Sequence, residues 1–547
     1  MHEIVTVQLG EQANYVGTHF WNAQVSGRVE EWTSLFNAVC LAFRSYLPPM
    51  RIQMFRLPTH LKRTHSDGGE RNLTSRIGAD GSETFTPRAV VYDLKGAFGT
   101  LRRENALYEL QGDAHLEQGP WSGSTNIIRE FPIAPSTYQQ HLDQGLDPPP
   151  LTTASVRFWS DYNRVFYHPR SIVQLHEYEL NSTLMPFERW NTGEELFSNL
   201  DREHDLLDRD LRLFLEECDQ LQGLQLIAGA DDAWGGFTAR YLERIRDELG
   251  KTSAWVWGLE NGGRKTREKM MLQTANIAQS LYHISPQASM YIPLTTVPSH
   301  VPAYVSFDAA SKWHTSALQA MALETITLPS RLRSGQIGRT SLSDVEATLG
   351  DDGNRKLARV DFGVEDPSVL AVSANGSAPH DSRVNGYSNG YEADGTSSLP
   401  HPEIAMQPRD VNLDGRRVPV RRNHVFSTLE SLRGTWKSSL EIEDTNLAAR
   451  NRFAHGPRTE SHQSQLLFPL LDSFPQILNF GSKPDKVAVQ ATLATASSVA
   501  DRVRSVERAA RLLIGIDERE ALCDGLLAIC EEYAEGWDSD DESEGDA

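Results

Sequence analysis

The sequence predicts an α/β protein with a doubly wound, largely parallel sheet, a smaller C-terminal α+β part and disordered inserts. Three observations support this class. Apolar strand-like segments alternate with helix-like segments, β-branched residues open the chain, and a hydrophobic content of 39% is diluted by polar stretches. Alternating strands and helices favour a parallel sheet covered on both faces, with ligands at the carboxyl ends of its strands.

The opening stretch MHEIVTVQLGEQANYVGTHFWNA predicts a strand, a loop and a helix. Ile4 and Val5 suit a buried strand, the segment from Gly10 to Gly17 is expected to form a turn, and a helix carrying Trp21 follows. The first amides of such a helix lack partners within the helix and can bind an anion. The opening therefore raises the question of a nucleotide site.

Later segments continue the alternation of strands and helices. Strands are expected over 88–96, 221–229, 253–259 and 486–494, and helices over 194–220, 238–250, 267–284, 497–514 and 517–537.

Composition divides the chain into five expected parts. The segment 331–425 contains few large apolar residues, so it is expected to be largely disordered. The parts are an N-terminal segment 1–145 with a polar insert at 59–87, a core continuation over 146–330, the insert 331–425, a C-terminal region 426–537 and an acidic tail 538–547.

Charge and cysteine usage exclude several classes of protein. A net charge of -21 argues against direct nucleic-acid binding, which needs a basic surface. Cys40, Cys218, Cys523 and Cys530 lack metal-ligand spacing, and the last two are expected to be core thiols. No segment is long and apolar enough to span a membrane, and the N-terminus is unlike a signal or transit peptide, so a cytosolic location is expected.

The order of several motifs resembles the tubulins. The opening stretch, RAVVYDLKG, EECDQLQGLQL and TANIAQSL follow the order of the tubulin core, and two helices with an acidic tail end the chain. With its long insert and the segment RFWSDYNRVFYHPRSIVQLHEYE, the chain resembles the Misato family, particularly its fungal members.

The resemblance implies a role in the distribution and partitioning of mitochondria and in the inheritance of their DNA. It implies peripheral association with the cytosolic face of mitochondria, besides the cytoplasm, through a partner that is an outer-surface, cytoskeletal or chaperonin protein. Two alternatives remain open: a GTP-binding filament protein, and an assembly factor for tubulin.

The phosphate loop departs from the tubulin pattern. In GADDAWGGFTA, the tubulin glycines and threonine are mostly replaced, by Asp231, Asp232, Ala233 and Trp234, while Gly235 and Gly236 remain. A carboxylate about 4 Å from a phosphate would cost on the order of 4 kcal/mol at an effective dielectric constant near 20. We therefore expect no GTPase activity, and GTP binding is doubtful.

A vestigial nucleotide site is the remaining expectation. The resemblance places Gly10, Asn14 and the guanine-reading Asn276 in it, while Glu11 and Gln12 differ from the tubulin residues. Glu11 is either a magnesium ligand or a surface carboxylate, with the surface role favoured. Asn276 is either a guanine ligand or a helix-surface amide. No resident metal or other cofactor is expected.

Other polar residues are interpreted as non-catalytic. Asp344 and Glu346 lie in the polar insert and are expected to be solvated. Ser539 and Ser543 each precede an acidic residue by three positions, which suits an acidophilic kinase, although a solubilising tail is the favoured interpretation.

Overall fold

The structure of the chain is a computed structural model, and its described parts confirm the predicted α/β class. It describes residues 3–24, 73–77, 83–101, 133–263, 265–332, 339–350, 354–365, 410–413, 424–434, 458–480 and 483–533.

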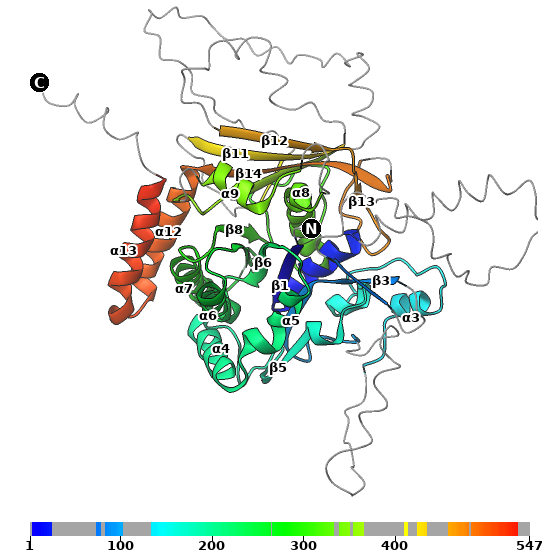
Figure 1. The fold of residues 1–547 in the computed structure, drawn as a ribbon, viewed down its shortest axis with the longest axis horizontal. Coiled ribbons are helices and arrows are strands. Elements are labelled where there is room, and N and C mark those ends of the chain that lie inside the picture. Colours follow the sequence, from blue (N-terminus) through cyan, green and yellow to red (C-terminus); the bar gives the residue numbers. More distant parts are fainter. Residues whose placement is uncertain are drawn as a thin grey trace, which may run out of the picture.

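A six-stranded parallel sheet forms the centre of the fold (Figure 1). Val7 lies between Val90 and Leu226 of the neighbouring strands, and all three side chains are buried. Burial on both faces suits these apolar, largely β-branched sequences. In spatial order the strands are β5 (Ile172–Glu179), β4 (Ala89–Lys95), β1 (Glu3–Leu9), β6 (Leu221–Gly229), β7 (Ser253–Glu260) and β8 (Met290–Thr295).

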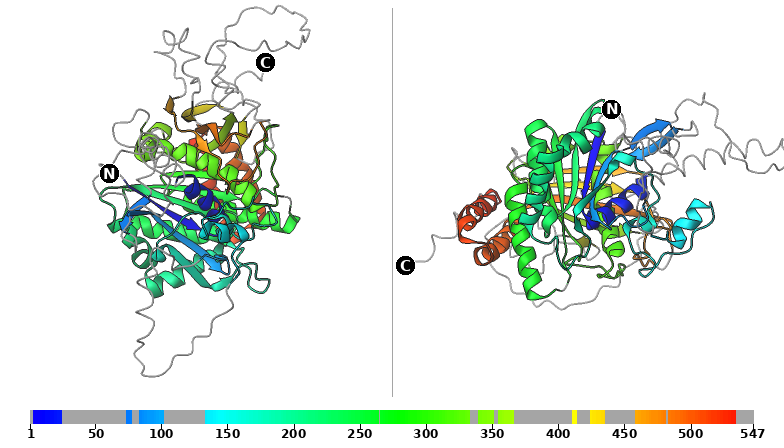
Figure 2. Two further views of the ribbon diagram at one scale, coloured as in Figure 1. Left: turned by 90° about the vertical axis from the view of Figure 1, so that its right-hand side faces the viewer. Right: turned by 90° about the horizontal axis from the view of Figure 1, so that it is seen from below.

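One face of this sheet packs against a layer of helices. Val5, Val7 and Leu9 of β1 point into this layer, and the C-terminal helices join it by packing against α7. Figure 2 shows the C-terminal pair at the outer side of α7. The helices are α4 (Trp190–His204), α6 (Ala233–Glu248), α7 (Arg267–Ile284), α12 (Ser498–Leu513) and α13 (Ile516–Glu532).

The opposite face packs against helix α8 (Lys312–Arg331), and a second sheet covers the outer side of α8 (Figure 1). Its strands are antiparallel except for the parallel pair β11 and β12. The order is β10 (Asp410–Asn412), β9 (Arg359–Glu365), β14 (Lys486–Ala496), β11 (Val425–Arg433) and β12 (Arg458–Ser464), with β13 (Phe468–Pro469) beside β14 and α9 (Leu342–Leu349) packed on β11.

Two helices differ from those expected from sequence. The chain is helical from residue 11 to 24, because Gly10 alone makes the turn with φ of +94°. The expected helix over 194–220 is interrupted at Asp205, which adopts a left-handed conformation. A π-helix η3 (Leu207–Leu211) and α5 (Arg212–Glu216) follow that break.

The polar inserts contain regular structure. The expected disordered insert 331–425 supplies α9, β9 and β10, and β9 is ordered because it pairs with β14 in the second sheet. The insert 59–87 contains a hairpin of β2 (Leu73–Ile77) and β3 (Glu83–Pro87). Residues 59–72 and 78–82 of the first insert, residues 333–338, 351–353, 366–409 and 414–423 of the second, and the tail 538–547 lie outside the described residues.

Short elements complete the fold, and none of the described helices is long and apolar enough to cross a membrane. They are α3 (Thr137–Asp143) and the 3-10 helices η1 (Trp159–Tyr162) and η2 (Pro169–Ser171).

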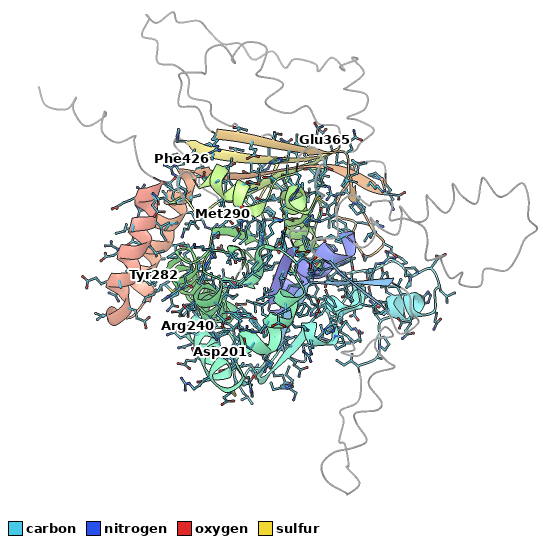
Figure 3. The ribbon with its side chains drawn as sticks, viewed as in Figure 1. Asp201, Arg240, Tyr282, Met290, Glu365 and Phe426 are labelled. Carbon is cyan, nitrogen blue, oxygen red and sulfur yellow. The ribbon has the colours of Figure 1, made fainter. Side chains whose placement is uncertain are left out.

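Aromatic contacts fix the C-terminal helices to the body (Figure 3). Tyr282 of α7 lies against Gly525 of α13, where an added Cβ would come within 2.3 Å of the tyrosine ring. Phe426 packs beneath the guanidinium group of Arg355, 3.8 Å from the ring centroid, and beside Tyr533. Cys523 and Cys530 are buried free thiols in this region, which confirms their prediction as core residues.

A buried ionic triad connects α8 to the second sheet. Glu324 accepts a hydrogen bond from Nη2 of Arg331 at 2.8 Å and forms an ion pair with Arg433 of β11. All three residues are at most 5% exposed, and burial lowers the pKa of both guanidinium groups. The single carboxylate therefore compensates two desolvated cations.

We predict that Glu324→Gln lowers the free energy of unfolding by about 3–5 kcal/mol, because it removes the carboxylate that two buried guanidinium groups contact. Urea unfolding measures this change. Glu243→Gln is the matched control, since Glu243 forms an exposed ion pair with Arg240 and its loss should cost less than about 1 kcal/mol. Equal effects of the two substitutions would contradict the structural role of the triad.

Candidate functional site

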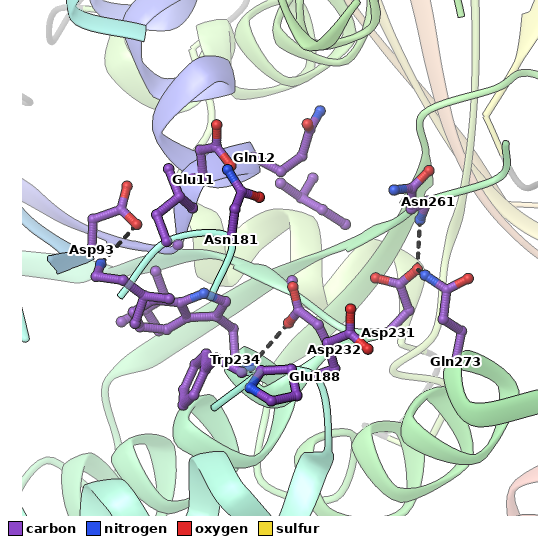
Figure 4. A pocket seen from close by; sticks show the side chains of 18 of the residues that line it. Glu11, Gln12, Asp93, Asn181, Glu188, Asp231, Asp232, Trp234, Asn261 and Gln273 are labelled. Atoms are coloured by element: carbon purple, nitrogen blue, oxygen red, sulfur yellow. Dashed lines mark hydrogen bonds between the residues drawn. The ribbon is translucent and has the colours of Figure 1, made fainter. Parts of the chain in front are cut away.

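A polar cavity of about 240 Å³ lies at the carboxyl ends of β1, β4, β6 and β7 (Figure 4). The end of β4 contributes Asp93 to its lining, the segments that follow the other three strands contribute Gly10, Asp231 and Asn261, and α7 contributes Gln273. This edge of a parallel sheet is where doubly wound proteins bind ligands. The expected nucleotide site therefore corresponds to a real cavity.

The loop after β1 is fixed by hydrogen bonds to β4. The amide of Gly10 donates to the carbonyl of Tyr92 at 3.1 Å. Nδ2 of Asn14 donates to the same carbonyl and to Oδ2 of Asp93, the latter at 2.7 Å. Asn14 is fully buried and outside the cavity lining, so it positions Asp93 rather than facing a ligand.

Glu11 and Gln12 line the cavity and connect it to α8. Glu11 forms an ion pair with Lys312 at the start of α8, so it is not an isolated surface carboxylate. Nε2 of Gln12 donates to Oε1 of Gln319 at 3.0 Å, and Gln319 donates in turn to the carbonyl of Leu294. Both sequence-predicted residues are thus in the site, held by partners that the sequence analysis did not identify.

Asp232 caps helix α6 from inside the cavity. Its Oδ1 accepts a hydrogen bond from the amide of Trp234 at 2.9 Å, as an N-cap residue does. The N-terminus of a helix is the position at which this fold class binds phosphate, because free amides and the helix dipole both favour an anion. In this chain the protein's own carboxylate takes that position.

Asp231 is directed to the other wall of the cavity. Its Oδ2 accepts hydrogen bonds from the amide of Asn261 at 2.9 Å and from Nε2 of Gln273 at 2.7 Å (Figure 4). These bonds join the ends of β6 and β7 to α7. Neighbouring aspartates therefore serve two different structural connections while both face the same cavity.

Trp234 fills the space beside Gly10. A Cβ added to Gly10 would lie 2.5 Å from Nε1 of this indole, so only glycine allows the approach. The ring is 5% exposed and packs edge-on against Phe187 and Phe237, with ring centroids 5.2 and 5.5 Å away. A bulky aromatic residue thus stands where a glycine-rich loop would leave room for phosphates.

Gly235 and Gly236 are packing residues in the first turn of α6, outside the cavity lining. A Cβ on Gly236 would lie 2.0 Å from the carbonyl oxygen of Trp190 in α4, and one on Gly235 would lie 2.2 Å from Oγ of Ser280 in α7. The structure thus differs from their expected role as a phosphate cradle, because close helix contacts require both glycines.

Asn276 is buried in α7 and also lies outside the cavity lining. Its Nδ2 donates to the carbonyls of Glu188 and Asp231, and its Oδ1 accepts from the amide of Trp190 at 3.1 Å. The structure supports neither expected role, guanine ligand or helix-surface amide. Asn276 instead connects three segments around the site.

Burial perturbs the carboxyl groups of the cavity. Desolvation, reinforced by Glu11, raises the pKa of Asp93 to about 7. Desolvation also raises the pKa of Asp231, and the same cause with the charge of Asp231 raises the pKa of Asp232. A second anion such as a phosphate would add to these unfavourable interactions.

The expected solvated pair in the insert is only half confirmed. Asp344 is exposed and caps α9 together with Ser341. Glu346 instead accepts hydrogen bonds from Nε1 of Trp255 at 2.8 Å and from Oγ of Ser253, and burial raises its pKa. The difference arises because α9 docks on the end of β7, which the sequence pattern of the insert does not reveal.

Two further expectations concern metals and phosphorylation. Among the residues that the structure describes, no group of three or more His, Cys, Asp or Glu side chains is arranged to hold a metal ion. Ser539 and Ser543 lie outside the described residues.

Sequence reasoning missed the roles of Lys312 and Gln273, and it named Trp234 as a replaced loop residue without predicting its contact with Gly10. Trp234 carried a signal, because an aromatic residue within a glycine-rich loop must occupy ligand space. Lys312 and Gln273 carried none, since each meets its carboxylate partner only through the tertiary fold.

Comparison with known families gives two matches. A family model described as a tubulin domain matches residues 148–332. A second model, described as the Misato Segment II tubulin-like domain, matches residues 2–32 and 65–144. Together the matched segments supply all six strands of the parallel sheet.

Full-length relatives are similar over the entire chain. Protein DML1 of Phaeosphaeria nodorum is 43% identical over 555 residues, and protein dml1 of Aspergillus clavatus is 44% identical over 562 residues, with 100% of both chains covered in each case. Protein misato homolog 1 of Bos taurus is 30% identical over 412 residues, which cover 68% of this chain and 66% of the bovine protein.

The raised pKa of Asp232 predicts a pH-dependent stability. Because the folded state holds the Asp232 proton more tightly than the unfolded chain, the free energy of unfolding should fall as the pH rises above about 4. Asp232→Asn keeps the capping oxygen and removes this titration. The variant should therefore gain stability relative to the wild type between pH 4 and pH 8, by at most about 1.4 kcal/mol per pH unit.

Urea unfolding at several pH values measures this difference. Asp247→Asn, at the exposed far end of α6, is the control and should stay within about 0.5 kcal/mol of the wild type throughout. Parallel curves for Asp232→Asn and the wild type would show that the Asp232 carboxylate is not destabilised by burial.

Proposed function

Because this chain belongs to the DML1/Misato family, as its motif order predicted, we propose that it is a non-enzymatic, tubulin-like factor for the distribution of mitochondria and the inheritance of their DNA. The tubulin-like core and the identity to DML1 proteins support the family part of this proposal. The mitochondrial part of the proposal rests on the family resemblance.

One observation carries the non-enzymatic part: the Asp232 carboxylate caps α6 where a phosphate would bind. The Trp234 indole occupies the adjoining space against Gly10. A bound triphosphate would have to displace the cap and approach Asp231 as well. One such repulsion costs about 4 kcal/mol, and this cost lowers nucleotide affinity about a thousandfold.

A tubulin-like body without a phosphate switch favours a stable adaptor over a cycling polymer. Nucleotide hydrolysis shifts a conformational equilibrium only through contacts that differ between the two nucleotide states. In this chain the contacts around the start of α6 come from the protein itself, through Asp232, Trp234 and the Glu11–Lys312 ion pair. They do not change with a nucleotide state. We propose that the adaptor acts peripherally at the cytosolic face of mitochondria through an outer-surface protein partner.

An assembly factor for tubulin is the second candidate. The match of residues 148–332 to a tubulin domain favours it, because a tubulin-like surface can dock onto tubulin or onto the chaperonin that folds it. A GTP-binding filament protein is the third candidate, which the occupied phosphate position disfavours.

We predict that the purified full-length chain carries far less than one guanine nucleotide per molecule and hydrolyses added GTP no faster than buffer. Denaturation followed by ion-exchange chromatography measures bound nucleotide, with tubulin prepared in parallel as the positive control. A stoichiometric guanine nucleotide would refute the non-enzymatic adaptor.

We predict that depletion of the protein fragments or clusters mitochondria and causes daughter cells to lose mitochondrial DNA while microtubules remain normal. Organelle shape, DNA retention and microtubules are followed over the same hours. Loss of microtubules before the mitochondrial defect would favour the tubulin-assembly candidate. Protease treatment of intact mitochondria should degrade the bound protein, and a protected matrix protein would contradict the cytosolic-face location.

A further inference from the structure

The cavity has a surplus of negative charge that the described residues do not compensate. Seven carboxylates and two lysines contribute to its lining. They are Glu11, Asp93, Glu179, Glu188, Asp231, Asp232 and Glu260, with Lys269 and Lys312.

Both lysines are already engaged in ion pairs. Lys312 pairs with Glu11, and Lys269 pairs with Glu188 at 2.8 Å. Glu260 pairs with Arg502 of α12. Within the described part of the chain, this leaves Asp93, Glu179, Asp231 and Asp232 without an ion pair, although Lys265 and Lys312 lie near enough to the aspartates to act on them electrostatically.

Trp234 adds a second, independent feature that points to a ligand. This residue is 5% exposed and lines the cavity. Its indole N–H donates to no atom of the described residues, and Figure 4 shows this nitrogen on the ring edge that faces Glu11 and Asn181. An N–H donor that belongs to a largely buried residue and faces the cavity without a protein acceptor favours an acceptor oxygen in a bound molecule.

We propose that the cavity binds a guanidinium group, in the form of an arginine residue whose carbonyl oxygen accepts from Trp234 Nε1 and whose side chain lies against Asp231 and Asp232. Such a group presents a fork of N–H donors suited to carboxylates, and it is more weakly hydrated than an ammonium ion. Those properties fit a half-enclosed acidic cavity with an aromatic wall.

The competing occupants fit the cavity less well. A triphosphate would be repelled by the carboxylates described above. A divalent metal needs several converging ligands, and Asp231 and Asp232 turn one oxygen each to protein amides instead. The guanidinium proposal shares with the proposed function only the premise that no nucleotide fills the cavity, and it does not depend on the mitochondrial role.

Proton release should accompany binding. Asp93 is faced by Asn14, Glu11 and Lys312, while Asp231 and Asp232 are faced by each other and by Lys265, Lys312 and Glu260. A bound cation favours the ionised form of all three aspartates, whose pKa values are raised in the empty cavity. Affinity should therefore increase between pH 5.5 and pH 8.

The test is calorimetric titration of the full-length chain with N-acetylarginine methylamide. We expect saturable binding of one ligand per chain, tighter at pH 8 than at pH 5.5. The Asp231→Asn/Asp232→Asn double variant should bind at least tenfold more weakly. Asn keeps the N-cap oxygen of α6, and thermal melts verify that the variant is folded.

Asp247→Asn is the matched control. It makes the same substitution on α6, about 22 Å from the cap at 1.5 Å per residue, and should bind like the wild type. No saturable binding to the wild type, or equal binding to the folded double variant, would overturn the proposal.

Three further ligands define the chemistry and its source. N-acetyllysine methylamide should bind more weakly than the arginine probe, and equal binding would refute the guanidinium assignment. Displacement of the arginine probe by MgCl₂ at constant ionic strength would identify a metal site instead. A flexible peptide with a central arginine should compete with the probe, whereas binding of free arginine alone would indicate a small-molecule site and contradict an arginine residue as the ligand.

Nucleotide content, measured on the same preparation, separates this proposal from the proposed function. Bound GTP in a chain that lacks arginine binding would overturn both. Absence of GTP together with absence of arginine binding would overturn only the guanidinium site.

Discussion

Helix α8 is buried along almost its whole length, and this constraint determines how the two sheets must pack. Every residue from 315 to 331 is buried, so each polar side chain on the helix needs a partner in the protein. Thr327 and Ser330 bond to carbonyls of their own helix, whereas Glu324 requires Arg331 and Arg433. The second sheet is therefore held against α8 by both apolar packing and a buried ionic contact.

The same helix shapes the cavity at the edge of the parallel sheet. Its first turn places Lys312 beside Glu11, and Gln319 holds Gln12 two turns later. The loop after β1 is thus fixed from α8 on one side and from β4, through Asn14, on the other. A cavity wall that is attached to the central helix in this way does not need a ligand to order it.

The cavity lies at the edge where doubly wound proteins bind ligands, and carboxylates outnumber lysines in its lining. In a phosphate site, free amides and basic groups meet an anion, but here Asp232 satisfies the first amides of α6 and the lysines are paired with glutamates. The three remaining aspartates are costly to bury without a cation. Three such groups at the ligand-binding edge are understandable if a cationic group completes the site, whereas a purely structural core would be more stable with neutral residues.

The sequence by itself determined the α/β class and the type of several elements, whereas β8 and the central helix α8 were not among those expected. β-branched runs such as that around Val5, and helical spacing in α6, α7 and α12, reflect preferences of the local backbone, so they are readable from short windows. The position of the site at the ends of the strands followed from the same alternation. Gly10, Glu11 and Gln12, which the family resemblance pointed to, line the cavity at that edge, and their nucleotide contacts stay a prediction.

Only the tertiary structure decided which side chains face the cavity and what each one contacts. Glu11 meets a lysine 301 residues away, and Gln12 meets a glutamine 307 residues away. Gly236 and Asn276 matched a nucleotide-binding pattern, yet close packing between α4, α6 and α7 uses both. Strand β9 is ordered within a polar insert because β14 pairs with it. Such partners are selected by the packing of distant segments, which no local sequence pattern encodes.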